Sequence, residues 1–77
     1  IMKITYDKEA DAAMIYLQEI KQGGTAWTYP CDPTEIKGMI NLDFDKDNRL
    51  IGIEVLDASK RLPKELLDSA ERIDKSG

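Results

Sequence analysis

The sequence contains no histidine and a single cysteine, Cys31. Because histidine is the commonest zinc ligand and a frequent catalytic base, its absence excludes the many hydrolase active sites and zinc sites that depend on histidine. One cysteine excludes a disulfide within the chain, and the only charged residue next to Cys31 is Asp32, which does not activate a thiol. We therefore expect an inert thiol, and we expect no catalytic residues, no bound metal and no cofactor.

Long apolar runs and an excess of positive charge are also missing. The net charge is -4, and no apolar run approaches the roughly 20 residues of a membrane-spanning helix. An acidic chain repels nucleic-acid backbones and anionic lipids. The one basic cluster (Lys60, Arg61 and Lys64) is followed at once by Glu65 and Asp68, which favours a solvated face. With no signal-peptide pattern at the start, we expect a cytoplasmic protein that binds neither membranes nor nucleic acids.

The small size of the chain bears on its assembly. A chain of 77 residues is expected to form one domain over residues 1–77, burying only roughly 60% of the surface that its unfolded form exposes. Such small cores are commonly supported by disulfides, a structural metal or oligomerisation. Because the first two are not favoured here, we predict a homodimer.

The N-terminal part of the chain predicts a hairpin. Apolar and polar residues alternate up to Tyr6, which is typical of a half-buried strand. Residues 12–17 fit both a helix and a strand. Folding the chain back across residues 7–12 pairs apolar residues on one face, which favours a strand after a helical turn capped by Asp7. A helix over residues 8–20 is the alternative. The pairs in the hairpin are Tyr6 with Ala13, Ile4 with Ile15 and Met2 with Leu17.

A third strand is predicted over residues 25–29, where Trp27 and Tyr29 lie on one side. Pro30 ends it, because proline cannot donate to a strand ladder. The two aromatic residues fit a binding platform as well as a place in the core. Residues 31–37 are interpreted as an irregular loop.

The strongest fold signal is a second hairpin with Asp47-Asn48 at its turn. In that register three apolar pairs share one face. Pro63 suits the first position of a short C-terminal helix whose apolar stripe covers the sheet. The sequence thus predicts an α+β fold, with a small antiparallel sheet of four to five strands in two hairpins packed by this helix. The apolar pairs are Ile40 with Val55, Leu42 with Ile53 and Phe44 with Ile51, and the stripe is Leu66, Leu67, Ala70 and Ile73.

The second hairpin overlaps a calcium-loop pattern. Acidic residues occupy its first, third, fifth and twelfth positions, namely Asp43, Asp45, Asp47 and Glu54. However, Asn48 stands where such a loop has glycine, and helices are not indicated on either side. At about 3.3 Å per strand residue, Glu54 lies roughly 13 Å from Asp45. We therefore interpret the segment as a hairpin that does not bind calcium.

A candidate functional face remains on the outward side of this hairpin, where Asn41, Asp43 and Glu54 surround Gly52. Asp43 and Glu54 are diagonal neighbours at about 7 Å. Such a pair can share a divalent ion, or act as acid and base when burial separates their pKa values. A solvated face is the competing interpretation. The acidic residues of the first turn are expected to serve capping and solubility: Asp7, Glu9 and Asp11.

Several segments of the chain carry a family pattern: residues 2–7 (MKITYD), 9–11, 15–17, 41–45 (NLDFD) and 50–59 (LIGIEVLDAS). In these segments the chain resembles the small prokaryotic domain-of-unknown-function family numbered twenty-two eighty-three. The resemblance covers most of residues 2–62 and implies a compact sheet domain. It implies no activity and no catalytic residues, and the loop at Cys31 and the helix after Pro63 lie outside it.

The functional prediction is a small, non-catalytic protein-interaction or regulatory module that acts as a homodimer. Its partner is an unidentified protein, and an antitoxin-like role, in which the chain masks a partner enzyme, is one version. The alternative is a carboxylate-based divalent-metal site or small hydrolase centred on Asp43 and Glu54.

Overall fold

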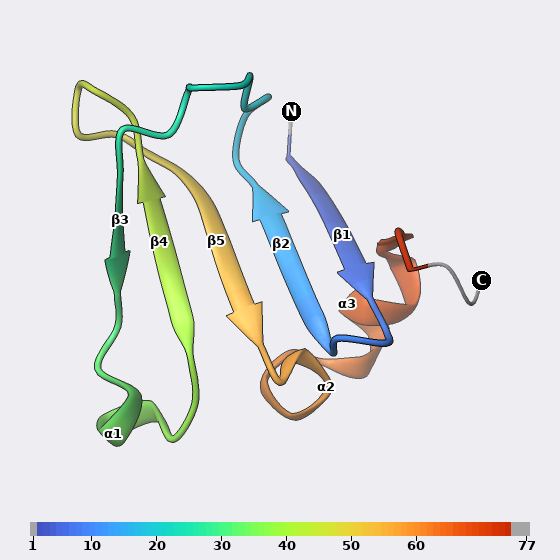
Figure 1. Cartoon of the computed structure of the whole chain (residues 1–77). Coiled ribbons are helices and arrows are strands. Elements are labelled where there is room, and N and C mark those ends of the chain that lie inside the picture. Colours follow the sequence, from blue (N-terminus) through green and yellow to red (C-terminus); the bar gives the residue numbers. More distant parts are fainter. Residues whose placement is uncertain (1, 75–77) are drawn as a thin grey trace.

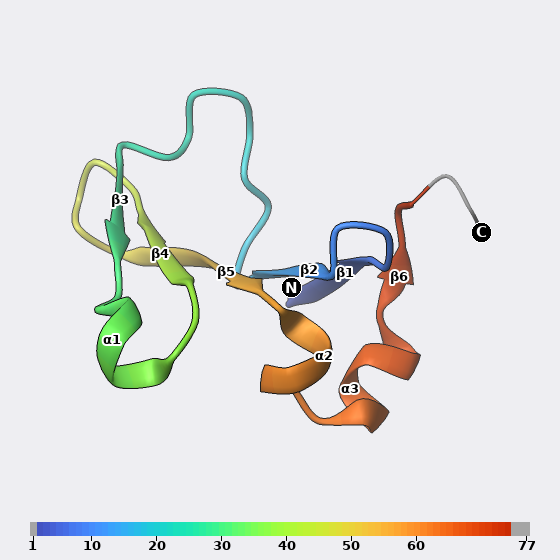
Figure 2. The same ribbon diagram turned by 60° about the horizontal axis from the view of Figure 1, so that its bottom comes forward.

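The computed structural model describes residues 2–74, which form one six-stranded sheet and three short helices. The strand order is β3-β4-β5-β2-β1-β6 (Figure 1; β6 is labelled in Figure 2), and all neighbours are antiparallel except β1 and β6. The α+β class is confirmed, but the sheet has more strands than the four to five expected. The strands are β1 (Lys3–Asp7), β2 (Ala12–Tyr16), β3 (Trp27–Pro30), β4 (Ile40–Phe44), β5 (Leu50–Leu56) and β6 (Glu71–Arg72), and the helices are α1 (Pro33–Ile36), α2 (Ala58–Arg61) and α3 (Lys64–Ser69).

The first hairpin, β1 and β2, has the predicted register. Ile4 lies opposite Ile15 and Tyr6 lies opposite Ala13. The Asp7 carboxylate accepts from the backbone N–H groups that follow it, Glu9 at 3.0 Å and Ala10 at 3.2 Å, as expected of a capping residue. The alternative helix over residues 8–20 is wrong, because β2 forms strand pairs with β1 on one side and with β5 on the other.

The second hairpin, β4 and β5, keeps two of its three predicted pairs, Ile40 with Val55 and Leu42 with Ile53. The third is wrong: Phe44 lies opposite Leu50, and Ile51 is an extra residue in β5 that forms a β-bulge. The shift arises because the turn is longer than two residues, with the N–H of Asp45 donating to the carbonyl of Arg49 at 3.0 Å.

The helices differ most from the sequence predictions. Residues 31–37 contain α1, whose start is capped by the Asp32 carboxylate accepting from the N–H of Thr34 at 2.9 Å. The C-terminal helix α3 is shorter than predicted and begins after Pro63, so Ile73 lies beyond it and is 55% exposed. Helix α2 precedes it and was not predicted, since four residues are too few to show a helical period. Among residues 2–74, none of the helices has the length and apolar character needed to cross a bilayer.

The core lies between one end of the sheet and the helices. Tyr6, Ala13 and Val55 from the sheet and Ala58 from α2 form a buried cluster. All three helices lie on one side of the sheet, and the loop between β2 and β3 rises on the other side (Figure 2). The predicted packing of the C-terminal helix on the sheet is confirmed, because residues of α3 and its flanks pack against the cluster: Leu62, Leu67 and Ala70.

Candidate functional site

The three predicted site residues lie on the sheet face opposite the helices. Asn41 faces Glu54, and Asp43 faces Gly52. The side-chain amide of Asn41 donates to the Glu54 carboxylate at 2.9 Å. The hydroxyl of Thr28, from β3, donates to the Asp43 carboxylate at 2.7 Å. The structure therefore brings Asn41 and Glu54 into contact and gives Asp43 a separate partner.

Apolar carbons occupy the space above Gly52. A Cβ atom built on this glycine would lie 2.7 Å from Met14 Cε and 3.1 Å from Ile20 Cδ1, so the missing side chain lets both residues lie against β5. Across residues 2–74, no group of three or more histidine, cysteine or acidic side chains is placed to hold a metal ion. The hydrogen-bond partners of Asp43 and Glu54 are thus Thr28 and Asn41, and not each other.

The turn of the second hairpin uses its oxygen atoms internally. Oδ1 of Asp45 accepts from the backbone N–H groups of Asp47 at 2.9 Å and Arg49 at 3.0 Å. These bonds, chiefly the one from Arg49, hold the pKa of Asp45 below its usual value. Asn48 adopts the left-handed conformation with φ 62°, and its side-chain oxygen accepts from the indole N–H of Trp27 at 3.1 Å. The apparent calcium loop is thus a hairpin turn tied to β3.

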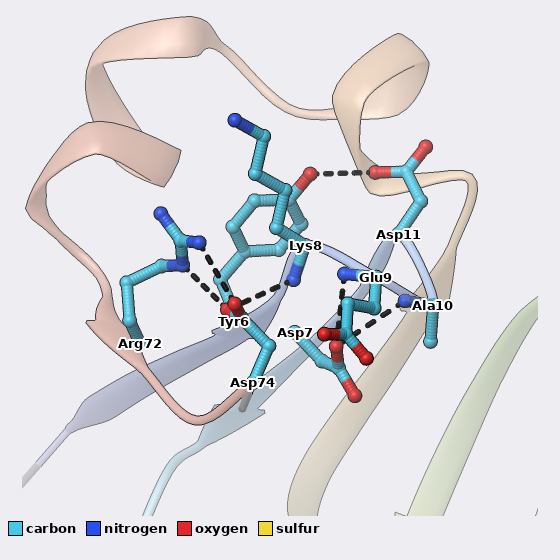
Figure 3. Close-up of polar contacts among 8 residues, drawn as sticks. All are labelled: Tyr6, Asp7, Lys8, Glu9, Ala10, Asp11, Arg72 and Asp74. Atoms are coloured by element: carbon cyan, nitrogen blue, oxygen red, sulfur yellow. Dashed lines mark hydrogen bonds and ion pairs between the residues drawn. The ribbon is translucent and has the colours of Figure 1, made fainter. Parts of the chain in front are cut away.

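A polar cluster that the sequence did not indicate connects the first turn with α2. Asp11 adopts a left-handed conformation with φ 52°. Its Oδ1 accepts from the Tyr6 hydroxyl at 2.7 Å (Figure 3) and from the Ser59 N–H at 2.9 Å, and its Oδ2 accepts from the Ser59 hydroxyl at 2.7 Å. Its carbonyl accepts from the N–H of Ala58 at 2.9 Å. We call Tyr6, Asp11 and Ser59 the Asp11 cluster.

The chemistry of the Asp11 cluster favours a structural role. Hydrogen bonds from Ser59 and Tyr6 lower the pKa of Asp11, and the bond to Asp11 raises the pKa of Tyr6. A carboxylate of lowered pKa is a poor general base for the Ser59 hydroxyl, because efficient bases titrate near the working pH. Capping and solubility, as predicted for Asp11, describe only part of its role. Local sequence does not indicate the hydrogen bonds between Asp11 and α2, because Asp11 and Ser59 are 48 residues apart.

The C-terminal strand is also attached to the first turn. The N–H of Lys8 donates to the Asp74 carboxylate at 3.2 Å, and Arg72 forms an ion pair with the same carboxylate at 2.6 Å (Figure 3). The N–H of Ile73 donates to the carbonyl of Tyr6 at 3.1 Å. These contacts extend the sheet past β1 and explain the sixth strand.

The remaining candidates from the sequence are separated or occupied. The Arg61 guanidinium donates to the carbonyl of Ile36, and the Lys64 ammonium lies 3.6 Å from the Asp68 carboxylate, so the basic cluster offers no continuous cationic surface. Cys31 is half-buried.

An open pocket of about 590 Å³ on the polar face is lined by charges of both signs and by uncharged groups: Lys3, Tyr16, Gln18, Glu19 and Ile20.

The aromatic residues of β3 lie outside the core. Trp27 is 45% exposed and Tyr29 is 53% exposed. The indole ring of Trp27 stacks on Phe44, with ring centroids 4.5 Å apart and planes inclined by 13°. Tyr29 lies opposite Leu42, on the helix side of the sheet. The interpretation that places both aromatic residues in the core is therefore wrong.

Fold and site together define a one-sheet α+β domain whose candidate polar groups are engaged in turns, caps and contacts between strands. The chain belongs to the family described as Protein of unknown function (DUF2283), whose family model matches residues 3–59, more than half of the chain. The match includes the loop at Cys31, which was expected to lie outside it, and ends before α3 and β6. No curated protein and no solved structure matches the chain significantly.

Proposed function

We propose that this protein is a non-catalytic protein-interaction module that acts as a homodimer. The observation that carries the proposal is the small amount of apolar surface that the chain buries by itself. In the part of the chain that the structure describes, the buried apolar residues are Tyr6, Ala13, Ile51, Val55 and Ala58. Two of these are alanines, which contribute little area. A core of this size rarely stabilises a domain without further support.

The exposed area supports the same proposal. The chain exposes 5612 Å², whereas a compact monomer of 8.7 kDa is expected to expose about 4,700 Å². The radius of gyration is 12.6 Å, against about 11.5 Å for a compact domain of this length. The excess of several hundred Å² is comparable with the roughly 800 Å² that one partner contributes to a standard protein interface.

The polar face gives the homodimer a surface for another protein. Asn41, Asp43 and Glu54 lie on this face, where their hydrogen bonds fix the side chains in place. Fixed polar groups favour recognition, because less conformational entropy is lost when a partner binds. An antitoxin-like role in the cytoplasm is one form of this proposal.

Light scattering on the purified chain tests the homodimer. We expect a mass twice that of the chain at micromolar concentration, and a melting temperature that rises with protein concentration because association stabilises the folded state. A monomeric mass, together with cooperative unfolding at a temperature independent of concentration, would contradict the proposal.

A further inference from the structure

The helix side of the sheet is apolar well beyond the helices. One complete row across five adjacent strands contains no charged residue: Ile4, Ile15, Ile53, Leu42 and Tyr29. Phe44 and Trp27, which lie opposite each other, follow in the next row. We call the following six residues the uncovered apolar surface: Ile4, Ile15, Trp27, Tyr29, Leu42 and Phe44.

The helices do not reach this surface. In Figure 1 they gather at one end of the sheet, and the other half of the strands has no helix over it. The core cluster lies one row closer to the helix end of the sheet than Ile4 and Ile15. In that row α2 and the region around α3 contact Tyr6, Ala13 and Val55. Trp27 and Tyr29 are exposed, and the other four residues of the uncovered apolar surface are half-buried.

Trp27 is held in a fixed position at this surface. Its ring is stacked on Phe44, and its N–H donates to Asn48 at 3.1 Å, yet 45% of the residue is exposed. An exposed tryptophan that is already ordered loses little entropy on binding, and tryptophan is a frequent energetic centre of protein interfaces. The chain thus presents an ordered apolar anchor.

Charge selects this face for contact between identical chains. The net charge is -4, so two copies repel one another at most orientations. The polar face carries Asp43, Glu54 and Lys3, so a contact between two copies through this face would bury charged side chains of both copies. The uncovered apolar surface brings no like charges together.

Resting on the proposed function, we propose that the uncovered apolar surface is the homodimer interface and that its occupant is the same surface of a second copy. The two sheets pack face to face at about 10 Å, as in a β-sandwich. A two-fold axis relates them, so that each copy contributes the same residues. Because the helices occupy one end of this face, the copies pack with their helices at opposite ends of the assembly.

Adjacent residues of β3 provide a matched test. Tyr29 lies on the uncovered apolar surface, whereas Thr28 lies on the polar face beside Asp43. Tyr29→Lys and Thr28→Lys add the same charge to the same strand. We expect Tyr29→Lys to raise the dimer dissociation constant at least tenfold, measured by analytical ultracentrifugation, and Thr28→Lys to change it less than threefold. If Tyr29→Lys unfolds at low concentration, we expect a higher concentration to restore its folded circular dichroism spectrum.

The single tryptophan provides a second measurement that needs no variant. Trp27 is the only tryptophan in the sequence, so emission excited where tyrosine does not absorb reports on this surface alone. As the wild-type protein is diluted, we expect the emission maximum to move to longer wavelength over the same concentration range in which the mass falls to that of a monomer.

The outcomes separate the two proposals. A wild-type dimer that Tyr29→Lys leaves intact, or that dissociates without a change in Trp27 emission, overturns the interface and leaves the homodimer standing. Equal weakening by both variants overturns the assignment to this face. A wild-type monomer at all concentrations overturns both proposals, and it would leave a different protein as the occupant of this surface.

Discussion

The two hairpin turns are built alike and serve different ends of the sheet. In each, an aspartate accepts backbone hydrogen bonds at the start, Asp7 in the first turn and Asp45 in the second. Each also has a left-handed residue, Asp11 or Asn48, whose side-chain oxygen accepts from a distant element. Asp11 binds the start of α2, on the covered half of the sheet, whereas Asn48 binds Trp27, on the uncovered half.

This difference shows how one local motif acquires two roles. The first turn places the two oxygens of a charged carboxylate against three donors and fastens α2 over the core. The second places a neutral oxygen against one donor and orders an exposed ring. Hydrogen bonds to charged groups are worth more than neutral ones, so the first turn is expected to matter for stability and the second for recognition.

The largest expected effect is from Asp11→Ala, which removes all three side-chain hydrogen bonds of the Asp11 cluster and also places alanine at a strained φ of 52°. We expect the free energy of unfolding to fall by about 2 to 3 kcal/mol. Urea denaturation at one fixed protein concentration measures this loss. Glu9→Ala, in the same turn, is the control and should be nearly neutral. A loss no larger than that of the control would show that the first turn does not fasten the helices.

The second-largest expected effect is on the pH dependence of folding stability, to which the two turns contribute differently. The pKa values of Asp11 and Asp45 are lowered from 3.8, so their contributions are present above pH 3.8 and are lost as the pH falls through the lowered values. The pKa of Tyr6 is raised from 10.0, so its contribution is present below pH 10.0 and is lost as the pH rises through the raised value.

Both turns therefore contribute to the loss of stability in acid, which we call the acid limb of the stability–pH curve. Of the two turns, only the first contributes to the loss of stability in alkali, the alkaline limb. Urea midpoints measured across the pH range for the wild type and Asp11→Asn check this. We expect the variant to lose less stability on each side of neutrality than the wild type does. Identical pH profiles would contradict the assignment of the alkaline limb to the Asp11 cluster.

A smaller effect is expected from Asn48→Gly, which removes the hydrogen bond to Trp27 and keeps the left-handed backbone accessible. The free energy of unfolding should fall by less than about 1 kcal/mol, while the emission of Trp27 should change clearly. Asn48→Ala should be less stable by roughly a further 1 kcal/mol, because alanine is strained at this φ. Equal stability of the two variants would show that backbone strain is unimportant in this turn.

The smallest expected effect is that of calcium on the second turn. The Asp45 carboxylate accepts from two backbone N–H groups, so calcium would have to break those bonds to bind there. We expect millimolar Ca²⁺, Mg²⁺ or Mn²⁺ to leave the melting temperature unchanged in differential scanning calorimetry. A rise with Ca²⁺ that a chelator reverses would restore the metal-site interpretation.

Apolar alternation was sufficient to predict most of the sheet from the sequence. The registers of Ile4 with Ile15 and of Leu42 with Ile53 follow from it directly. The bulge at Ile51 could not be predicted from apolar alternation, because it depends on the turn hydrogen bond between Asp45 and Arg49. The short helices and the two-residue strand β6 could not be predicted either, since such segments are too short to show a periodic pattern of apolar residues.

The candidate site was predictable to a similar extent. Register alone placed Asn41 opposite Glu54, and the structure adds the hydrogen bond between them. The partner of Asp43 comes from β3, whose position beside β4 no local pattern encodes. The Asp11 cluster depends on the packing of α2 against the first turn, which is a tertiary contact and leaves no local trace.

The pairing of β2 with β5 at the middle of the sheet has a consequence during synthesis. Ala12 pairs with Leu56, so the first hairpin leaves the ribosome about 40 residues before its central neighbour. At a translation rate of about 5 to 20 residues per second, the β2 edge stays unpaired for roughly 2 to 8 s. Unpaired edges recruit strands from other chains. We therefore expect nascent chains of this protein to be prone to aggregation in that interval, before β5 pairs with β2.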